Sequence, residues 1–318
     1  MCESESMVGY HTAISIHPAR QRALGYGACA VAGCLWGTGF YFGKLALQEM
    51  GVNHMVLYRF LFACIGFLPV VLLHPARLKA AEWRVILVAA FLGIPIQFLV
   101  QFYGLSLTTV SHASLMVGTM PVILAAGAVL FAGESLDGFG WLALAGSTVG
   151  AALIVLGGRH AQSGTGPSLA GDLLIVISLI VSLGWVLLNK QLMRTHSPVV
   201  VTAYGILSGT AMLMVFVVLR SGLPPIHGIS TRAWMALAAS GILCTATSTL
   251  LWNWGIHHVP ASRAGVFLNI EPALGSWLGV KLLGDQLGPH AWMGGALIVA
   301  AAITLTTRGD QDLPIVPE

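Results

Sequence analysis

Charged residues are scarce in this sequence of 318 residues. Asp, Glu, Lys and Arg together make up 8% of it, whereas the hydrophobic residue types make up 56%. A soluble globular domain carries about 25% charged residues, so the composition excludes that class. The formal net charge of +3 is too small to indicate a nucleic-acid partner. The apolar runs are continuous rather than alternating, which also excludes an outer-membrane β-barrel.

Motifs for metal, disulfide or nucleotide chemistry are also missing. The five cysteines form no CxxC pair and no Cys/His cluster with metal-ligand spacing. No GxxxxGK[ST] loop is present, and the first 22 residues are polar and contain no apolar signal-peptide segment. We therefore predict no metal, no cofactor and no cleavable signal peptide. Any energy for the protein's work is expected to come from a gradient rather than from ATP.

Long apolar runs are abundant, each near the length of about 20 residues that a membrane helix needs. They predict an all-α integral membrane protein with ten transmembrane helices. The third run is interrupted by Gly93 and Pro95, which membrane helices tolerate where neighbouring groups satisfy the freed carbonyl. The runs span 23–43, 54–73, 84–104, 111–132, 138–157, 170–190, 198–219, 233–255, 262–283 and 289–307.

The two halves of the chain repeat each other. A shift of 151 residues places the first half on the second without a gap, and near the start of each half the offset becomes 146, with Lys44 on Lys190. Five helices per copy is an odd number, so the second copy must be inverted relative to the first. Inverted repeats are typical of secondary transporters, although duplication could also simply build a stable bundle. The matched pairs include Gly104 with Gly255, Ser111 with Ser262, Pro121 with Pro272, Glu134 with Asp285 and Trp141 with Trp292.

The distribution of basic residues predicts the orientation. With the N-terminus inside, nine Lys and Arg residues fall on the inner side and five on the outer side, so both termini are expected to be cytoplasmic. The predicted organisation is an N-terminal tail over 1–22, a first repeat over 23–157, a linker over 158–169, a second repeat over 170–307 and a C-terminal tail over 308–318.

The aligned residues also carry a family likeness. Over 23–307 the chain resembles an EamA-type member of the drug/metabolite transporter superfamily. Its motifs are Leu-Trp-Gly at 35–37, Tyr-Arg-Phe at 58–60, Tyr-Gly-Leu at 103–105, Gly-Glu at 133–134, Trp185, 261–264, and Glu-Pro at 271–272. The resemblance implies ten helices, cytoplasmic termini, a central cavity, and alternating-access transport of small metabolites, often export. One departure is Asp285, which stands where the family usually has Glu.

Two charged residues stand out away from the ends of predicted membrane helices, where a charge is costly and therefore points to function. The repeat counterpart of Glu271 is Met120, so only the second repeat carries a carboxyl group at this position. It could bind an ammonium group, take up a proton or pair structurally with a buried cation. Arg59 could attract an anionic group, pair with Glu271, or extend its side chain to the interface. Extension to the interface also accounts for Lys44 and Lys190, and His112 is expected to be interfacial.

Uncharged polar and aromatic residues add further cavity candidates. Gln97 and Gln101 are four residues apart and share one helix face. Asn269 contributes an amide two residues before Glu271. Trp36 and Trp252 could form apolar walls of a small-molecule site. Packing contacts between helices are the alternative for each of these residues.

These observations predict a secondary transporter, an exporter of a small metabolite such as an amino acid or amine, working by alternating access in the bacterial inner membrane. Its expected partners are the small-molecule substrate and the lipid bilayer; proton coupling and a homodimer are compatible with the sequence. The alternatives are an integral membrane enzyme acting on a lipid-soluble substrate, or a passive channel. The enzyme is disfavoured because Glu271 is the only carboxylate expected deep in a helix.

Overall fold

The computed structural model describes residues 18–73, 75, 78–132, 138–157, 167–256, 258–259 and 266–308, and these contain helices and no strand. Most of the predicted tails and linker, and the motif residues at 133–134 and 261–264, lie outside the described residues. In the first half the elements are α1 (Pro18–Gly37), α2 (Gly39–Leu47), α3 (Val52–Leu73), α4 (Ala80–Phe91), η1 (Leu92–Ile96), α5 (Gln97–Leu107), α6 (Val110–Val117), α7 (Met120–Ala132) and α8 (Gly138–Gly157).

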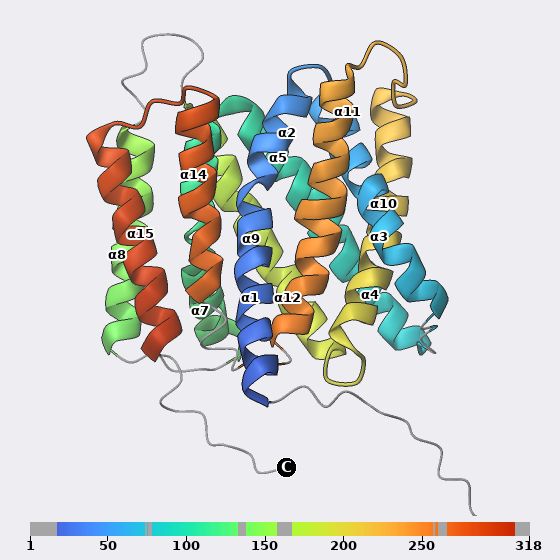
Figure 1. Cartoon of the computed structure of the whole chain (residues 1–318), viewed down its shortest axis with the longest axis horizontal. Coiled ribbons are helices and arrows are strands. Elements are labelled where there is room, and N and C mark those ends of the chain that lie inside the picture. The colour runs from blue at the N-terminus through green and yellow to red at the C-terminus, as the bar shows by residue number, and fades with distance from the viewer. Residues whose placement is uncertain are drawn as a thin grey trace, which may run out of the picture.

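The second half has a similar series of elements. These are α9 (Leu169–Leu192), α10 (Pro198–Ser221), α11 (Thr231–Ala238), η3 (Ala239–Thr247), α12 (Ser248–Ile256), η4 (Val266–Asn269), α14 (Ile270–Leu282) and α15 (Pro289–Arg308). Figure 1 shows the helices side by side in one slab, with the start of α1 and the end of α15 at the same lower edge. The helix α1 begins at Pro18, five residues before the predicted start at position 23, and so within the predicted N-terminal tail.

Within the described residues, six helices are long and apolar enough to cross a membrane: Arg20–Leu47, Val52–Leu73, Ala80–Leu107, Leu169–Leu192, Pro198–Ser221 and Thr231–Ile256. Three shorter helices of the same part of the chain are also apolar, at Val110–Ile123, Gly138–Ile154 and Pro289–Thr304. The chain is thus a helical, multi-pass membrane protein. The count of ten spans stays a prediction.

Three of these spans are interrupted. The first breaks at Thr38, whose hydroxyl donates to the carbonyl oxygen of Leu35 at 2.7 Å. The third contains the π-helical turn η1, where Pro95 lacks the N–H that an α-helix needs. Its counterpart in the second half, η3, is also π-helical, and there the Thr245 hydroxyl donates to the carbonyl of Ser240 at 3.0 Å. The interruptions place irregular backbone in the middle of the helix layer, where the cavity described below is found.

Two mirrored helix contacts show the repeat in three dimensions. In one, α5 packs against α9 so closely that a Cβ added at Gly104 would lie 2.9 Å from the carbonyl oxygen of Gly171. In the other, α12 packs against α1, and a Cβ added at Gly255 would lie 3.0 Å from the carbonyl oxygen of Gly25. Gly104 and Gly255 are repeat partners at offset 151, and Gly25 and Gly171 are partners at offset 146. Each half therefore packs its third span against the first span of the other half.

Adding a side chain at one of these contacts is expected to destabilise the protein. Gly104→Val should lower stability by about 2–3 kcal/mol, because the new Cβ meets the backbone of α9 at Gly171 as well as the side chain of Ile175. Thermal unfolding in detergent measures this change. Gly205→Val is the matched control, because a Cβ at Gly205 meets no atom within 4 Å. Equal unfolding temperatures for the two variants would contradict the close contact.

Candidate functional site

One cavity of about 570 Å³ lies between the two halves. Its volume is within the range of small-molecule sites. From the first half, α1, α2, α3, η1 and α5 contribute wall residues; from the second half, α9, α10, η3, α12 and α14 do. The site is thus assembled across the repeat interface.

Six of the seven candidate residues named from the sequence line this cavity: Glu271, Gln97, Gln101, Trp36, Trp252 and Arg59. Asn269 does not, although its side chain is buried. Gln97 and Gln101, which the spacing places on one helix face, both line the cavity.

Arg59 is the buried cation of the site. Its side chain is 6% exposed, so the prediction that it could extend to the interface is wrong. The Nε atom donates to the Thr245 hydroxyl at 3.1 Å, and the guanidinium carbon lies 5.3 and 5.2 Å from the ring centres of Phe98 and Phe102. These contacts orient the guanidinium, and none of them is to a carboxylate. The positive charge remains available to an anionic group in the cavity.

Glu271 lies in the first turn of α14, where the helix dipole favours a carboxylate. Among the described residues, no ion pair joins it to Arg59 and no hydrogen bond reaches its side chain. Both residues lie near the break in the first span: a Cβ at Gly37 would lie 3.2 Å from the Glu271 carbonyl oxygen, and one at Gly39 would lie 3.7 Å from the Arg59 guanidinium. The cavity wall thus holds a carboxyl group and a buried guanidinium that do not pair directly, and Lys190 adds an exposed ammonium group.

Neutral polar atoms and aromatic rings complete the wall. The Gln97 Oε1 and Asn253 Nδ2 atoms are buried and have no hydrogen-bond partner in the described part of the chain. An unpartnered buried polar atom is costly, so both are suited to a ligand or water. The rings of Trp36 and Trp252 lie 5.4 Å apart and form an apolar side.

Several wall residues lie outside the set of seven candidates chosen from the sequence. Trp185 and Asn189 lie on α9, with Met193 at its C-cap, at intervals of four residues, which places them on one helix face toward the cavity. That spacing was a usable signal. Phe98 and Phe102 gave no such signal, because aromatic residues in an apolar run are indistinguishable from packing residues.

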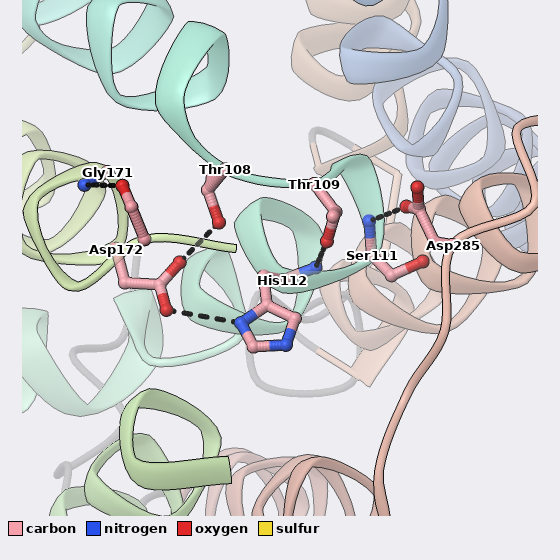
Figure 2. A network of polar contacts seen from close by, with 8 residues as sticks. Thr108, Thr109, Ser111, His112, Gly171, Asp172 and Asp285 are labelled. Atoms are coloured by element: carbon pink, nitrogen blue, oxygen red, sulfur yellow. Dashed lines mark hydrogen bonds and ion pairs between the residues drawn. The ribbon is translucent and has the colours of Figure 1, made fainter. Parts of the chain in front are cut away.

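A buried polar network lies beyond the cavity, at the start of α9 (Figure 2). Asp172 accepts a hydrogen bond from the Thr108 hydroxyl at 2.6 Å, and its other oxygen lies 3.1 Å from His112 Nδ1. His112 and Asp172 are both 1% exposed. His112 thus lies near a helix end, as predicted, but it is buried against a carboxylate, and the helices contain Asp172 as a buried acid in addition to Glu271.

Two further contacts close this end. The Lys44 ammonium donates to the carbonyl oxygens of Leu105 and Thr108, at 2.7 and 2.6 Å. Lys44 thus caps the last turn of α5 rather than reaching the interface. The backbone N–H of Ser111 donates to Asp285 Oδ2 at 2.8 Å, so this carboxylate sits at the start of α6, as Figure 2 shows. The network joins α2, α5 and α6 of the first half to α9 and to the segment that follows α14 in the second.

A surface contact also joins the halves, between the α2–α3 connection and the start of α11. Glu49 accepts hydrogen bonds from the Ser230 backbone N–H at 2.7 Å and the Ser230 hydroxyl at 2.6 Å. These two hydrogen bonds lower the pKa of the Glu49 carboxyl group below its ordinary value. The contact therefore holds at neutral pH and weakens as pH falls through that lowered pKa.

The chain is similar to several known proteins in sequence and to a solved structure in fold. An uncharacterized transporter of Archaeoglobus fulgidus is 23% identical over 282 residues, covering 87% of this chain and 95% of that protein. A probable terminal-alkyne amino-acid exporter of Streptantibioticus cattleyicolor is 24% identical over 281 residues, covering 86% and 90%. A protein of known crystal structure shares the fold, with a TM-score of 0.62 at 20% identity, covering 91% of this chain and 96% of that one.

The EamA-like transporter family matches the chain twice, over residues 23–156 and 169–307. The two matches correspond to the two halves that share the cavity, and they confirm the resemblance carried by the sequence motifs. The protein belongs to the EamA-like transporter family.

Proposed function

We propose that this protein is a secondary transporter that exports a small zwitterionic metabolite, an amino acid with an apolar side chain, across the bacterial inner membrane. The observation that carries the proposal is the pair of unlike charged residues, Arg59 and Glu271, which both line the cavity without an ion pair between them in the described part of the chain. A passive channel has no need of such a pair, and a cavity assembled across two repeats suits alternating access.

The substrate class follows from the chemistry of the wall. A carboxylate fits the Arg59 guanidinium, and an ammonium group fits Glu271, each as a charge-assisted hydrogen bond. The unpartnered Gln97 oxygen and Asn253 amide can complete the polar contacts. The Trp36–Trp252 side of the cavity suits an apolar side chain. The amino-acid exporter named among the relatives supports the same class for this chain.

The proposed direction and orientation rest on the cavity's asymmetry. Its lining runs along α9 from Leu179 to Lys190 and the C-cap Met193, and Lys190 is exposed. The α9–α10 connection lies at the same lower edge of Figure 1 as the start of α1 and the end of α15. With both termini in the cytoplasm, the cavity opens to the cytoplasm, and the Lys44–Asp172 network closes the external end. An exporter loads its substrate in this state.

Counterflow in proteoliposomes tests the proposal. Vesicles loaded with unlabelled leucine or norvaline should take up the labelled amino acid faster than protein-free vesicles. The matched amine and carboxylic acid, which each lack one charge, should compete at least tenfold less well, because each leaves one buried charge unpaired. Equal competition by the amine or the acid would leave transport standing but would refute the zwitterion. Absence of exchange for amino acids, amines and sugars would refute transport itself.

A further inference from the structure

The two repeat-related lysines differ in their surroundings. Lys44 lies in the last turn of α2, and its ammonium group is held by two carbonyl oxygens at the end of α5. Lys190 lies in the last turn of α9, is exposed at the mouth of the cavity and makes no hydrogen bond with the described residues. One lysine is therefore engaged at the closed end, and its counterpart is free at the open end.

The helices that carry these lysines differ in the same way. At the closed end, α2 packs against α5. At the open end, α12, which corresponds to α5, is not among the elements that pack closely against α9 in the described part of the chain. The sequence is repeated but the two ends are not in the same state. Inverted repeats can exchange their two conformations, so that each end in turn adopts the arrangement now seen at the other.

We infer that Lys190 acts as a latch, a residue that holds the cytoplasmic end of the molecule closed. When that end closes, its ammonium group caps the last turn of α12, as Lys44 caps α5 at the external end. The offset of 151 places Leu105 on Ile256 and Thr108 on Val259, so the carbonyl oxygens of Ile256 and Val259 are the acceptors expected for Lys190. Both ammonium groups find helix C-terminal carbonyls, which carry partial negative charge. The inference rests on the alternating access of the proposed function.

In this proposal the two lysines stabilise opposite conformational states. Lys44 stabilises the state that is closed outside and open inside, whereas Lys190 stabilises the state that is open outside and closed inside. Removing either ammonium group should therefore shift the balance of the two states, and the two substitutions should shift it in opposite directions. A lysine that merely contacted substrate at the cavity mouth would not affect this balance in substrate-free protein.

A distance measurement between spin labels tests this. In full-length protein whose native cysteines are replaced, labels at Arg194 and Trp254, both exposed at the cytoplasmic ends of α9 and α12, report closure of that end in lipid nanodiscs without substrate. Lys190→Gln should reduce the short-distance population roughly tenfold, and Lys44→Gln should raise it by a similar factor, since each removes a charge-assisted hydrogen bond from one state only. The double variant should return towards the original ratio.

Lys281→Gln is the matched control, because Lys281 is also in the last turn of its helix and is exposed, and it should leave the distances unchanged. Lys190 is exposed as well, so Lys190→Gln should fold and can carry the test even where Lys44→Gln lowers the yield. An unchanged distribution in Lys190→Gln, shifts of the same sign in both variants, or a single fixed distance throughout would overturn the latch. None of these readouts depends on the substrate, so a wrong substrate class would leave the latch intact.

Discussion

Arg59→Gln is expected to remove recognition of the substrate carboxylate, and Glu271→Gln to remove recognition of its ammonium group. Arg59→Gln should weaken binding of the zwitterion and of the carboxylic acid roughly tenfold to a hundredfold, and leave the amine unaffected. Glu271→Gln should weaken the zwitterion and the amine by a similar factor, and leave the acid unaffected. Hydrogen bonds to charged groups contribute about 1.5–3 kcal/mol, which corresponds to these factors. Competition in the counterflow assay measures all three ligands.

The matched controls change the same chemical groups outside the cavity. Arg220→Gln alters an exposed guanidinium in the last turn of α10, and Glu82→Gln alters a carboxylate near the start of α4. Both should keep the original order of ligand preference. Uniform weakening of all three ligands by Arg59→Gln would show that the residue supports the fold, and the assignment of the carboxylate to Arg59 would fail.

Glu271→Gln also separates binding from energy coupling. If the carboxyl group carries the proton that is exchanged for substrate, the variant should lose accumulation driven by a pH gradient and retain some counterflow, because glutamine keeps the shape but cannot titrate. Uptake with and without an imposed pH gradient distinguishes the two. A variant that still accumulates substrate at the original rate and with the original pH dependence would assign proton coupling to another group.

Asp172→Ala is expected to cause the second large effect, on stability. The substitution removes the acceptor of the Thr108 hydroxyl and the partner of His112 in a fully buried position. Breaking a buried pair by removing one partner typically costs several kcal/mol, and about 3 kcal/mol is expected here. Thermal unfolding in detergent should show a clear decrease relative to the original protein.

Leu173→Ala is the control for this change. Leu173 is the next residue of α9 and is 47% exposed, so its truncation removes few internal contacts. It should unfold near the original temperature. If Asp172→Ala is as stable as Leu173→Ala, the pair contributes little to the fold, and the network at the closed end loses its main anchor between the two halves.

The sequence alone determined the class of protein, because membrane insertion depends on local hydropathy and charge. The scarcity of charged residues, the apolar runs and the repeated Gly, Pro and Trp residues were enough to predict a helical membrane protein of this family. The spacing of four residues was enough to place Gln97 and Gln101 on one helix face. Helix interruptions were visible only where a residue type enforces them: Pro95 indicated η1, but Thr38 and the residues of η3 carry no comparable signal.

The tertiary structure decided which side chains meet, because the partners are distant in sequence and their contacts depend on how whole helices pack. Arg59 reaches a hydroxyl 186 residues away and His112 a carboxylate 60 residues away. No local pattern marks either pair. The same holds for the two lysines: their sequence positions are equivalent, and the apolar helices around them are alike. Only the packing shows that Lys44 is held by carbonyl oxygens at the end of α5, whereas Lys190 is exposed and makes no hydrogen bond with the described residues.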